Sequence, residues 1–414
     1  MSDAAPELIR WLDSVSGPGW LWYAKYVAAN DTYAKPNVHQ GGPYVAKDLL
    51  RTAFPVLTAR SESQDKPDLF INVIMRSHQY VNDIRLVWYN SRIIERRANG
   101  RDEARLTQWG GRGVPLLEPN ATGSLVLFAF HQPVSTKDAI GCEIWLCAAP
   151  DEEDVILDRV GPVEPGAGTI FSPSEFLPLA PPPLSDRPCV LEASEIPPEW
   201  QSTFPSGDAI VERVAQHLSR SSQLGPDARL LKRRACEYEM FRSLESLLLL
   251  TRIRQGFDDV ESFVAFAHSV TNRRKSRGGK SLELHTKAIF DEEQLPYSWD
   301  QPTENKRTPD FVFPSITKYH DVSWSHAKLR ILAAKTTCKD RWRQITTEAA
   351  RVPVKHLLTL QEGISADQFE EMREEGVVLV VPQPLHKHYP EEIRPHLQSL
   401  ARFVFDTKAL VTSP

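Results

Sequence analysis

Cysteine is scarce in this sequence, and the few cysteines show no metal-binding or redox spacing. The five residues are Cys142, Cys147, Cys189, Cys236 and Cys338. Their odd number and the absence of a CxxC pair argue against a disulfide framework and against a structural zinc site. The sequence therefore predicts that cysteine chemistry plays no part in this protein.

Long apolar runs are also missing. No stretch approaches the roughly 20 apolar residues that a membrane-spanning helix needs, and a content of 41% hydrophobic and 25% charged residues is typical of a soluble globular protein. The start of the chain, MSDAAPELIRWLDS, carries early acidic residues and lacks the basic and apolar segments of a signal peptide. These features predict a cytoplasmic protein without a membrane partner.

A strong net charge of either sign is absent as well. The formal net charge of -5 does not exclude a nucleic-acid partner, because phosphate binding depends on local basic patches rather than on the total charge.

Internal repeats and low-complexity tails are not found, so the sequence gives no support to a solenoid or a disordered scaffold.

The length of 414 residues indicates two domains of about 150 to 200 residues each. The stretch from Gly161 to Pro183 is rich in proline and glycine and ends in three consecutive prolines, a composition typical of a stiff, extended linker. We predict a first domain at residues 1–160, a linker at 161–188 and a second domain at 189–414.

The two halves differ in their hydrophobic patterns. In the first half, short apolar or alternating runs predict a mostly β domain, with strands at Phe70 to Met75, Ile84 to Tyr89, Leu125 to Phe130 and Glu143 to Cys147. The second half begins with helical spacing from Asp227 to Gln255. After this helix, predicted strands and helices alternate, which is typical of an α/β domain. The strands are predicted at Asp310 to Phe313, Ile331 to Lys335, His356 to Leu360 and Val377 to Val381. The helices are predicted near Cys338 to Arg351, Ser365 to Glu375 and Glu391 to Phe405.

The clearest catalytic candidates are an aspartate and a lysine at the ends of two predicted strands. Asp310 opens the run DFVFP and Lys335 closes the run RILAAK, so a carboxylate and an ammonium can meet at one edge of a small sheet. Phosphodiester hydrolysis needs a carboxylate-held Mg2+ to polarise the phosphate and lower the pKa of a water, and a cation beside the developing charge. The pattern predicts a Mg2+-dependent nuclease.

Such a site needs a second carboxylate. In the most familiar version of the motif it lies two residues before the lysine, where this chain has Ala333. The segment CKDRWRQITTEAAR after the lysine is predicted as a helix, and Glu348 at its far end can replace the missing acid if its side chain returns to the same point in space. Glu283, in a helix predicted to start near Gly279, is a further candidate.

Two basic segments flank these residues. Asn272 to Lys280 (NRRKSRGGK) places five cations in nine residues, with glycines that let the backbone approach a phosphate closely. Lys339 to Arg343 (KDRWR) can read base edges, because arginine forms bidentate contacts with guanine and aspartate accepts from cytosine. The plainer interpretations are a solvated loop for the first segment and a network of salt bridges at a helix start for the second.

Two other functions compete with a nuclease. A non-catalytic, two-domain DNA-binding regulator would need only a β-rich reader and a basic α/β domain, but decay of a nuclease is expected to remove Asp310, Lys335 or Glu348, and all three are present. A metal-independent hydrolase could use Glu283 and Glu348 as paired carboxylates, but cations rather than aromatic residues surround these acids. A lysine at a strand end is more often a solvated edge residue, so the nuclease interpretation depends on the combination.

Taken together, these segments resemble the EcoRII-like family of restriction endonucleases. In the second half the resemblance lies in NRRKSRGGKSLELH, TPDFVFPS with Tyr319 and His320 following, AAKTTCKDRWRQI, LQEGIS and GVVLVVPQPLHKHYP. In the first half it lies in ANDT, the HQG at residues 39–41, the YNSR at 89–92, the TQWG at 107–110 and CAAPDEEDVI. The resemblance spans nearly the whole chain.

The resemblance implies a B3-like β-pseudobarrel in the N-terminal half and a restriction-endonuclease-like α/β core of the PD-(D/E)XK superfamily in the C-terminal half. It implies a type IIE enzyme, in which the N-terminal domain binds one copy of the target DNA as an allosteric effector and otherwise occludes the catalytic cleft. A homodimer of catalytic domains cuts another copy. The family target is CCWGG, cut ahead of the first cytosine to leave a 5′ overhang, with the bases of the central pair extruded. The bacterial or archaeal host would carry a companion DNA methyltransferase that the enzyme does not bind.

The resemblance also assigns roles to residues. Asp310, Lys335 and Glu348 match the family's permuted nuclease motif, with Asp310 and Glu348 as metal ligands, and Glu283 and Tyr319 match a supporting acid and a tyrosine near the scissile phosphate. The expected contacts with the cleaved DNA are Arg273, Arg274, Lys275, Arg277, Lys280, Lys339, Asp340, Arg341 and Arg343. The expected effector-DNA contacts are His39, Tyr44, Arg92, Arg96 and Arg105. The loop from Ile93 to Glu103 is longer than its family counterpart, and its cations are rearranged.

Overall fold

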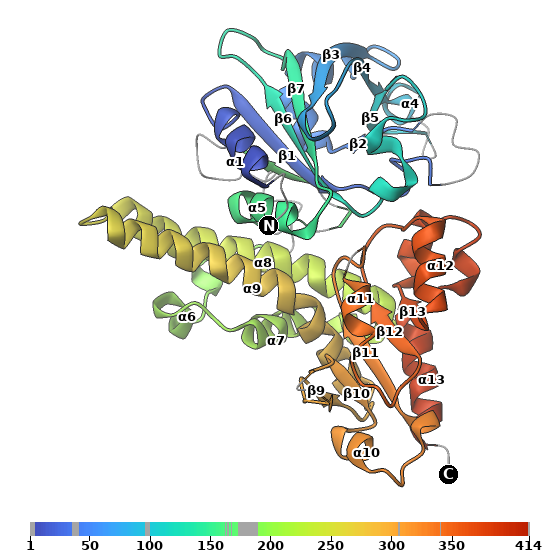
Figure 1. The fold of residues 1–414 in the computed structure, drawn as a ribbon. Helices are drawn as coiled ribbons and strands as arrows, with labels where there is room; N and C mark the ends of the chain where they lie inside the picture. Colours follow the sequence, from blue (N-terminus) through green and yellow to red (C-terminus); the bar gives the residue numbers. More distant parts are fainter. Residues whose placement is uncertain are drawn as a thin grey trace. The chain divides into compact units, whose positions relative to one another are not determined.

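A computed structural model of the chain describes residues 5–34, 41–95, 100–161, 163, 165–166, 168–172, 189–304, 307–339 and 341–412. The chain forms two compact units (Figure 1). The first comprises Met1–Pro181, Gln361–Phe369 and Lys387–Pro395, and the second comprises Pro182–Leu360, Glu370–His386 and His396–Pro414. None of the helices within the described ranges has the length and apolar character needed to cross a membrane.

The first unit is built on an eight-stranded sheet with the order β2-β5-β4-β3-β7-β6-β1-β8. Its strands are β1 (Trp20–Tyr26), β2 (Tyr44–Val45), β3 (Asp68–Met75), β4 (Tyr80–Tyr89), β5 (Glu103–Thr107), β6 (Leu125–His131), β7 (Gly141–Leu146) and β8 (Thr169–Phe171). Neighbouring strands are antiparallel except for the parallel pair β3 and β7. Its helices are α1 (Ala5–Ser14), α2 (Lys47–Ala53), α3 (Pro55–Arg60), α4 (Ser91–Ile94) and α5 (Pro150–Val160).

Both faces of this sheet are buried around β6. Because successive side chains of a strand point to opposite faces, Val126 and Phe128 join a core with α2 and α3, whereas Leu125 and Leu127 join a second core with α1 and α5. The uninterrupted apolar run of β6 follows from this double burial.

The second unit contains a five-stranded mixed sheet with the order β13-β12-β11-β10-β9. Its strands are β9 (Ser298–Trp299), β10 (Phe311–Phe313), β11 (Arg330–Ala334), β12 (Lys355–Leu358) and β13 (Val377–Val380). The strands β9, β10 and β11 pair antiparallel, and β11, β12 and β13 pair parallel. Its helices are α6 (Pro198–Ser202), α7 (Gly207–His217), α8 (Pro226–Gln255), α9 (Val260–Glu292), α10 (Ile316–His320), α11 (Trp342–Ile345) and α13 (Leu400–Thr412), and α12 (Ala366–Glu374) crosses from the first unit into the second.

Each face of this second sheet has its own core. Phe311 and Phe313 pack on one face with residues of α8, α9 and α13. Val312 and Ile331 point to the other face, where they pack with Tyr319 and with the segment that follows α11. The two faces therefore position different parts of the candidate site.

The strands predicted from the sequence are confirmed, since each predicted run overlaps one of the strands β3, β4, β6, β7, β10, β11, β12 or β13. The helices predicted at 227–255 and 365–375 are confirmed as α8 and α12. The helix predicted from Glu391 to Phe405 is wrong in its first part, because α13 begins only at Leu400. The backbone of Gln398 instead bonds to Leu379 and Val381, which holds it extended beside β13.

The stretch predicted as the linker contains β8, which pairs with β1. The sheet of the first unit thus includes residues beyond position 160.

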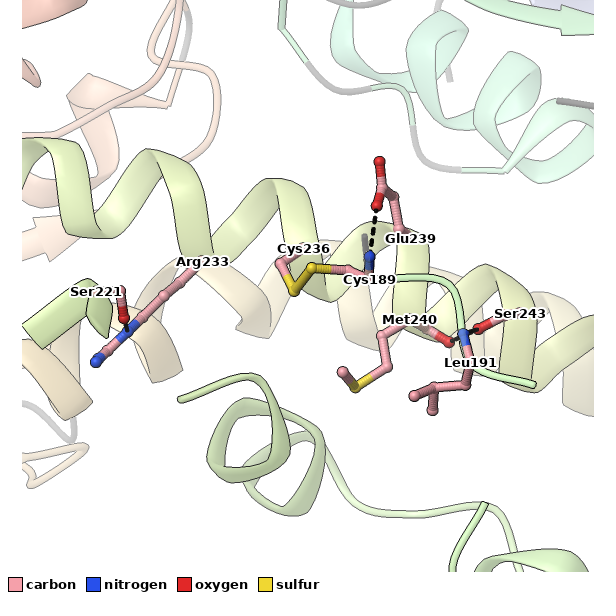
Figure 2. Close-up of a disulfide and its surroundings, with 8 residues drawn as sticks. All are labelled: Cys189, Leu191, Ser221, Arg233, Cys236, Glu239, Met240 and Ser243. Atoms are coloured by element: carbon pink, nitrogen blue, oxygen red, sulfur yellow. Dashed lines mark hydrogen bonds between the residues drawn. A yellow bond between two sulfur atoms is a disulfide. The ribbon is translucent and has the colours of Figure 1, made fainter. Parts of the chain in front are cut away.

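The expectation that the cysteines form no disulfide is wrong. Cys189 and Cys236 are joined, with their Cα atoms 5.2 Å apart (Figure 2). The segment of Cys189 is held along α8 by backbone N–H groups, from Cys189 to the Glu239 carboxylate at 3.3 Å and from Leu191 to the Ser243 hydroxyl at 3.0 Å. The two cysteines are 47 residues apart in the sequence, so only the tertiary fold brings them together.

Candidate active site

Asp310 and Lys335 meet at one edge of the five-stranded sheet. The antiparallel pairing of β10 with β11 places Phe311 opposite Leu332, so the residue before β10 lies beside the end of β11. The Asp310 Oδ2 atom accepts a hydrogen bond from the Ala334 backbone N–H at 2.7 Å and lies 2.9 Å from the Lys335 Nζ atom. The structure thus brings together the two side chains that the sequence placed at one edge.

Glu348 comes from a turn rather than from the predicted helix. Of the segment 338–351, the helix α11 includes only Trp342 to Ile345. Ala349 has a φ of 50°, a left-handed conformation that cannot continue a right-handed helix. Ala349 and Val352 are instead buried against the sheet with Tyr319. The helix predicted from Cys338 to Arg351 is therefore wrong, because packing of this turn outweighs local helical preference.

The Glu348 carboxylate is electrostatically linked to the Asp310 and Lys335 pair. Burial and the negative charge of Asp310 raise the pKa of Glu348 to about 7, and the ammonium of Lys335 acts in the opposite direction. Its Oε2 atom is buried and has no hydrogen-bond partner among the described residues. A buried carboxylate oxygen without a donor is stabilised by a cation.

Glu283 is a third acid at the same place. It lies on α9, where burial and the charge of Asp310 raise its pKa, while Lys280 and Lys335 oppose this shift. The Lys280 Nζ atom lies 2.9 Å from the Glu283 Oε2 atom. Glu283, Asp310 and Glu348 thus come from three separate elements, and the charge of Asp310 acts on both glutamates.

These oxygen donors fit a hard divalent cation. Within the described ranges, no group of three or more His, Cys, Asp or Glu side chains is arranged as a complete metal cage. Mg2+ does not require such a cage, because it is commonly held by one or two carboxylates together with waters and substrate phosphate oxygens. Asp310 and Glu348, with the unpartnered Oε2 atom, can supply the two carboxylates.

Tyr319 lies beneath the site. Its side chain is fully buried, and its hydroxyl donates to the Glu304 carboxylate at 2.6–2.7 Å and accepts from the Arg351 backbone N–H at 3.3 Å. Burial and the hydrogen bond with Glu304 raise the pKa of Tyr319. In this structure the hydroxyl therefore holds the Glu348 turn, rather than pointing outward toward a substrate phosphate.

The basic segment 272–280 is not a loop. It lies inside α9, so the helix predicted to start near Gly279 in fact begins at Val260. The guanidinium of Arg274 binds Glu245 at 2.7 Å, and the buried Arg277 lies 3.3 Å from Glu237. Both glutamates are on α8, so these two arginines are directed between the helices, which corrects their interpretation as phosphate contacts.

The other members of this segment have varied surroundings. The Arg273 guanidinium lies 4.3 Å from the centre of the Phe204 ring, and Lys280 pairs with Glu283 as described. The side chain of Lys275 lies outside the described residues.

The predicted base-reading segment lies at the start of α11. Arg341 is the residue before the helix and is exposed. Arg343 is also exposed and forms an ion pair with Glu371 at 2.7 Å, while Lys339 is half-buried. Asp340 lies outside the described residues.

Comparison with known proteins agrees with this geometry. The family described as "EcoRII C terminal" matches residues 241–404, and the family described as "Restriction endonuclease EcoRII, N-terminal" matches residues 16–175. The chain is 41% identical over 403 residues to the type II restriction enzyme EcoRII of Escherichia coli, with 97% of each chain covered. The chain belongs to the EcoRII family of type II restriction endonucleases. This EcoRII family member is therefore a site-specific deoxyribonuclease rather than a non-catalytic regulator.

Membership also settles the fold class. This EcoRII family member combines an N-terminal B3-like β-pseudobarrel with a C-terminal α/β core of the restriction-endonuclease type, as predicted. It is 26% identical over 124 residues to the type II restriction enzyme SsoII of Shigella sonnei, covering 28% of this chain and 40% of SsoII. Among solved structures, metal-depleted Ecl18kI in complex with uncleaved DNA is 19% identical, with a TM-score of 0.43 over 51% of this chain and 81% of that chain.

Three of the predicted effector contacts of this EcoRII family member can be located. Tyr44 in β2 pairs with Arg105 in β5, and the Arg105 guanidinium lies 3.6 Å from the centre of the Tyr44 ring. Arg92 lies in α4, where its backbone N–H donates to the Arg101 carbonyl at 3.0 Å. His39 and Arg96 lie outside the described residues.

Two residues near the site were missed from the sequence. Glu304 binds Tyr319, and Lys355 is buried beneath the turn of Glu348. The only signal for Lys355 is a lysine at the start of an otherwise apolar strand, which also describes many exposed lysines. Glu304 lies in an irregular segment and carries no such signal.

Proposed function

We propose that this enzyme hydrolyses a phosphodiester of double-stranded DNA with one Mg2+ ion held by Asp310 and Glu348. The observation that carries the proposal is the convergence of Asp310, Lys335 and Glu348 from three elements, with a buried Glu348 oxygen that lacks a donor. When bound, Mg2+ polarises the phosphate and lowers the pKa of an attacking water.

Lys335, Glu348 and Glu283 each contribute differently to the proposed site. Lys335 orients Asp310 through their ion pair, and its other N–H donors can stabilise the charge that develops on the phosphate. Glu348 would bind the cation in its ionised form, which its raised pKa disfavours in the absence of the cation. Glu283 supports the site by holding the Lys280 ammonium at the same edge.

We further propose that the target is CCWGG, cut to leave a 5′ overhang with the central bases extruded, as in the family. The exposed Arg341 and Arg343 and the neighbouring Lys339 and Asp340 would read the C·G pairs. Arg273, Lys275 and Lys280 would contact the backbone. For the domains, we propose that the first extends beyond the predicted boundary at 160 to include β8, and that the linker and the second domain follow it.

The N-terminal half would bind a second DNA copy as an effector through His39, Tyr44, Arg92, Arg96 and Arg105, and would otherwise occlude the catalytic cleft. The active form would be a homodimer formed through the catalytic domains. Its host would need a companion methyltransferase, which the enzyme would not bind.

The catalytic assignment is tested with Asp310→Ala. We expect this variant to cut a CCWGG plasmid in Mg2+ at least about a hundredfold more slowly than the wild type, because the metal and its electrostatic stabilisation are lost. Asp258→Ala, at an exposed acid in the connection between α8 and α9, is the matched control and should cut normally. Wild-type rates for the Asp310 variant, measured in single-turnover assays, would refute the assignment.

A further inference from the structure

One buried lysine, Lys355, forms hydrogen bonds with the turn that carries Glu348. Lys355 is only 4% exposed. Its Nζ atom donates to the carbonyl of Ala349 at 2.7 Å and also to the carbonyl of Val352. These carbonyls lie one and four residues after Glu348, so a single ammonium closes the turn onto the sheet.

A second set of hydrogen bonds, between Arg351 and the segment around Tyr319, holds the same turn. The Arg351 backbone N–H donates to the Tyr319 hydroxyl at 3.3 Å, and that hydroxyl in turn donates to Glu304. The Arg351 guanidinium donates to the carbonyls of Tyr319, Asp321 and Trp324. Residues 349, 351 and 352 are therefore each held, although Ala349 has a left-handed conformation that an alanine rarely adopts.

Lys355 is itself rigidly placed. It is the first residue of β12, where it pairs with Val377 of β13, and its backbone N–H donates to the Gly376 carbonyl at 2.9 Å. Its positive charge also acts on Glu304 and Glu348. A buried ammonium needs acceptors to offset its lost hydration, so the lysine and the two carbonyls depend on each other.

We propose that Lys355 is a positioning residue of the metal site: it fixes the turn so that the Glu348 carboxylate is held beside Asp310 and Lys335. Lys355 is buried beneath the turn, so in this proposal it acts through Glu348 rather than on the substrate or the metal. The inference rests on the proposed function, in which Glu348 is a metal ligand. Without the ammonium, the turn loses its hydrogen bonds to Lys355, the Glu348 carboxylate is less well placed, and the affinity for a divalent cation falls.

The test compares Lys355→Met, which keeps the length of the side chain but removes the donors, with Lys355→Arg, which keeps a charged donor. We expect Lys355→Met to raise the Mg2+ concentration for half-maximal cleavage about tenfold or more, the usual effect of removing a residue that orients a metal ligand. The maximal rate at saturating Mg2+ should fall much less. Lys355→Arg should restore most of the affinity.

Metal binding is also measured without catalysis, from the electron paramagnetic resonance of free Mn2+ in the presence of a target duplex and each protein. The matched control is Lys408→Met, which removes a lysine that pairs with Glu293 at 3.1 Å, and it should bind Mn2+ like the wild type. In a Glu348→Gln background, adding Lys355→Met should cause no further loss of Mn2+ affinity, because the two residues act through one carboxylate.

Thermal unfolding establishes that each variant is folded. If Lys355→Met does not fold, Lys355→Leu provides the same comparison, again without a donor. Wild-type Mn2+ affinity in either folded variant overturns the inference. If instead Asp310→Ala and Glu348→Gln themselves bind Mn2+ normally, the proposed metal site fails, whatever the Lys355 variants do.

Discussion

At the scale of single residues, the candidate site concentrates negative charge before any cation is bound. The pKa values of Glu283 and Glu348 are both raised, first by burial and then by Asp310. A buried carboxylate that is forced toward its neutral form costs folding free energy when it ionises. Ionisation of these carboxylates therefore lowers the stability of the protein, and the cation of the proposed function would offset this cost.

The pH dependence follows from the pKa of Glu348, which rises from an ordinary 4.5 to about 7 on folding. A raised pKa gives a stability contribution that is present below the unfolded value and is lost as pH rises through the folded value. In EDTA, we expect Glu348→Gln to have a higher melting temperature than the wild type at pH 8. The difference should disappear below about pH 4.5.

The charged groups that act on Glu348 are Asp310, Lys335, Lys355 and Arg307, so the comparison keeps all four unchanged. Adding Mg2+ at pH 8 should reverse the order, because only the wild type offers both carboxylates. A melting-temperature difference that stays constant from pH 4 to pH 8 would contradict this account.

At the scale of elements, α8 and α9 are joined by buried charge as well as by apolar packing. Glu237 on α8 contacts Arg277, Ser281 and His285 of α9. The nearby His285 imidazole, the Arg277 charge and the Ser281 hydrogen bond together outweigh burial and lower the pKa of Glu237 to about 2. Because α9 also carries Glu283, this buried pairing keeps one acid of the site in place.

We expect Glu237→Gln to lower the free energy of unfolding at pH 7 by about 3 to 5 kcal/mol, because it removes the carboxylate that pairs with the buried Arg277. The lowered pKa means that this contribution is present above the unfolded value and is lost as pH falls toward 2. Urea unfolding at pH 7 and near pH 3 should therefore show a large loss that shrinks on acidification.

The control for this prediction is Glu371→Gln. Glu371 forms an exposed ion pair with Arg343, and exposed pairs contribute about 1 kcal/mol or less. Equal losses in the two variants at pH 7 would show that the buried pair has no special role.

At the scale of the whole molecule, the chain contains a β-rich unit and an α/β unit. The similarity to the EcoRII family includes residues of both units. The proposed effector model requires two DNA sites with coupled free energies, since an effector acts only by a differential interaction with two states.

We expect a plasmid with two CCWGG sites to be cut at least about five times faster than a plasmid with one, the lower end of usual allosteric coupling. A short duplex with the same site, added in trans, should accelerate cleavage of the one-site plasmid. Equal rates on both plasmids would remove the effector model and leave the nuclease assignment intact.

The sequence by itself determined the strands, the α/β and β-rich halves, and the pairing of Asp310 with Lys335. Alternation of apolar side chains is a local property, and two consecutive strands need only to pair for the ends to meet. The sequence also predicts Glu348 as the second acid, although the helix predicted to carry it is wrong.

Only the tertiary structure decided how Glu348 is presented, which arginines face inward, and which cysteines join. The turn after α11 is held by hydrogen bonds to Lys355 and Tyr319, and Arg277 forms an ion pair with Glu237 of another helix. These contacts link residues that are distant along the chain or buried against other elements, and their energies can exceed the local helical preferences of about 1 kcal/mol or less per residue. Local sequence patterns therefore do not identify such partners.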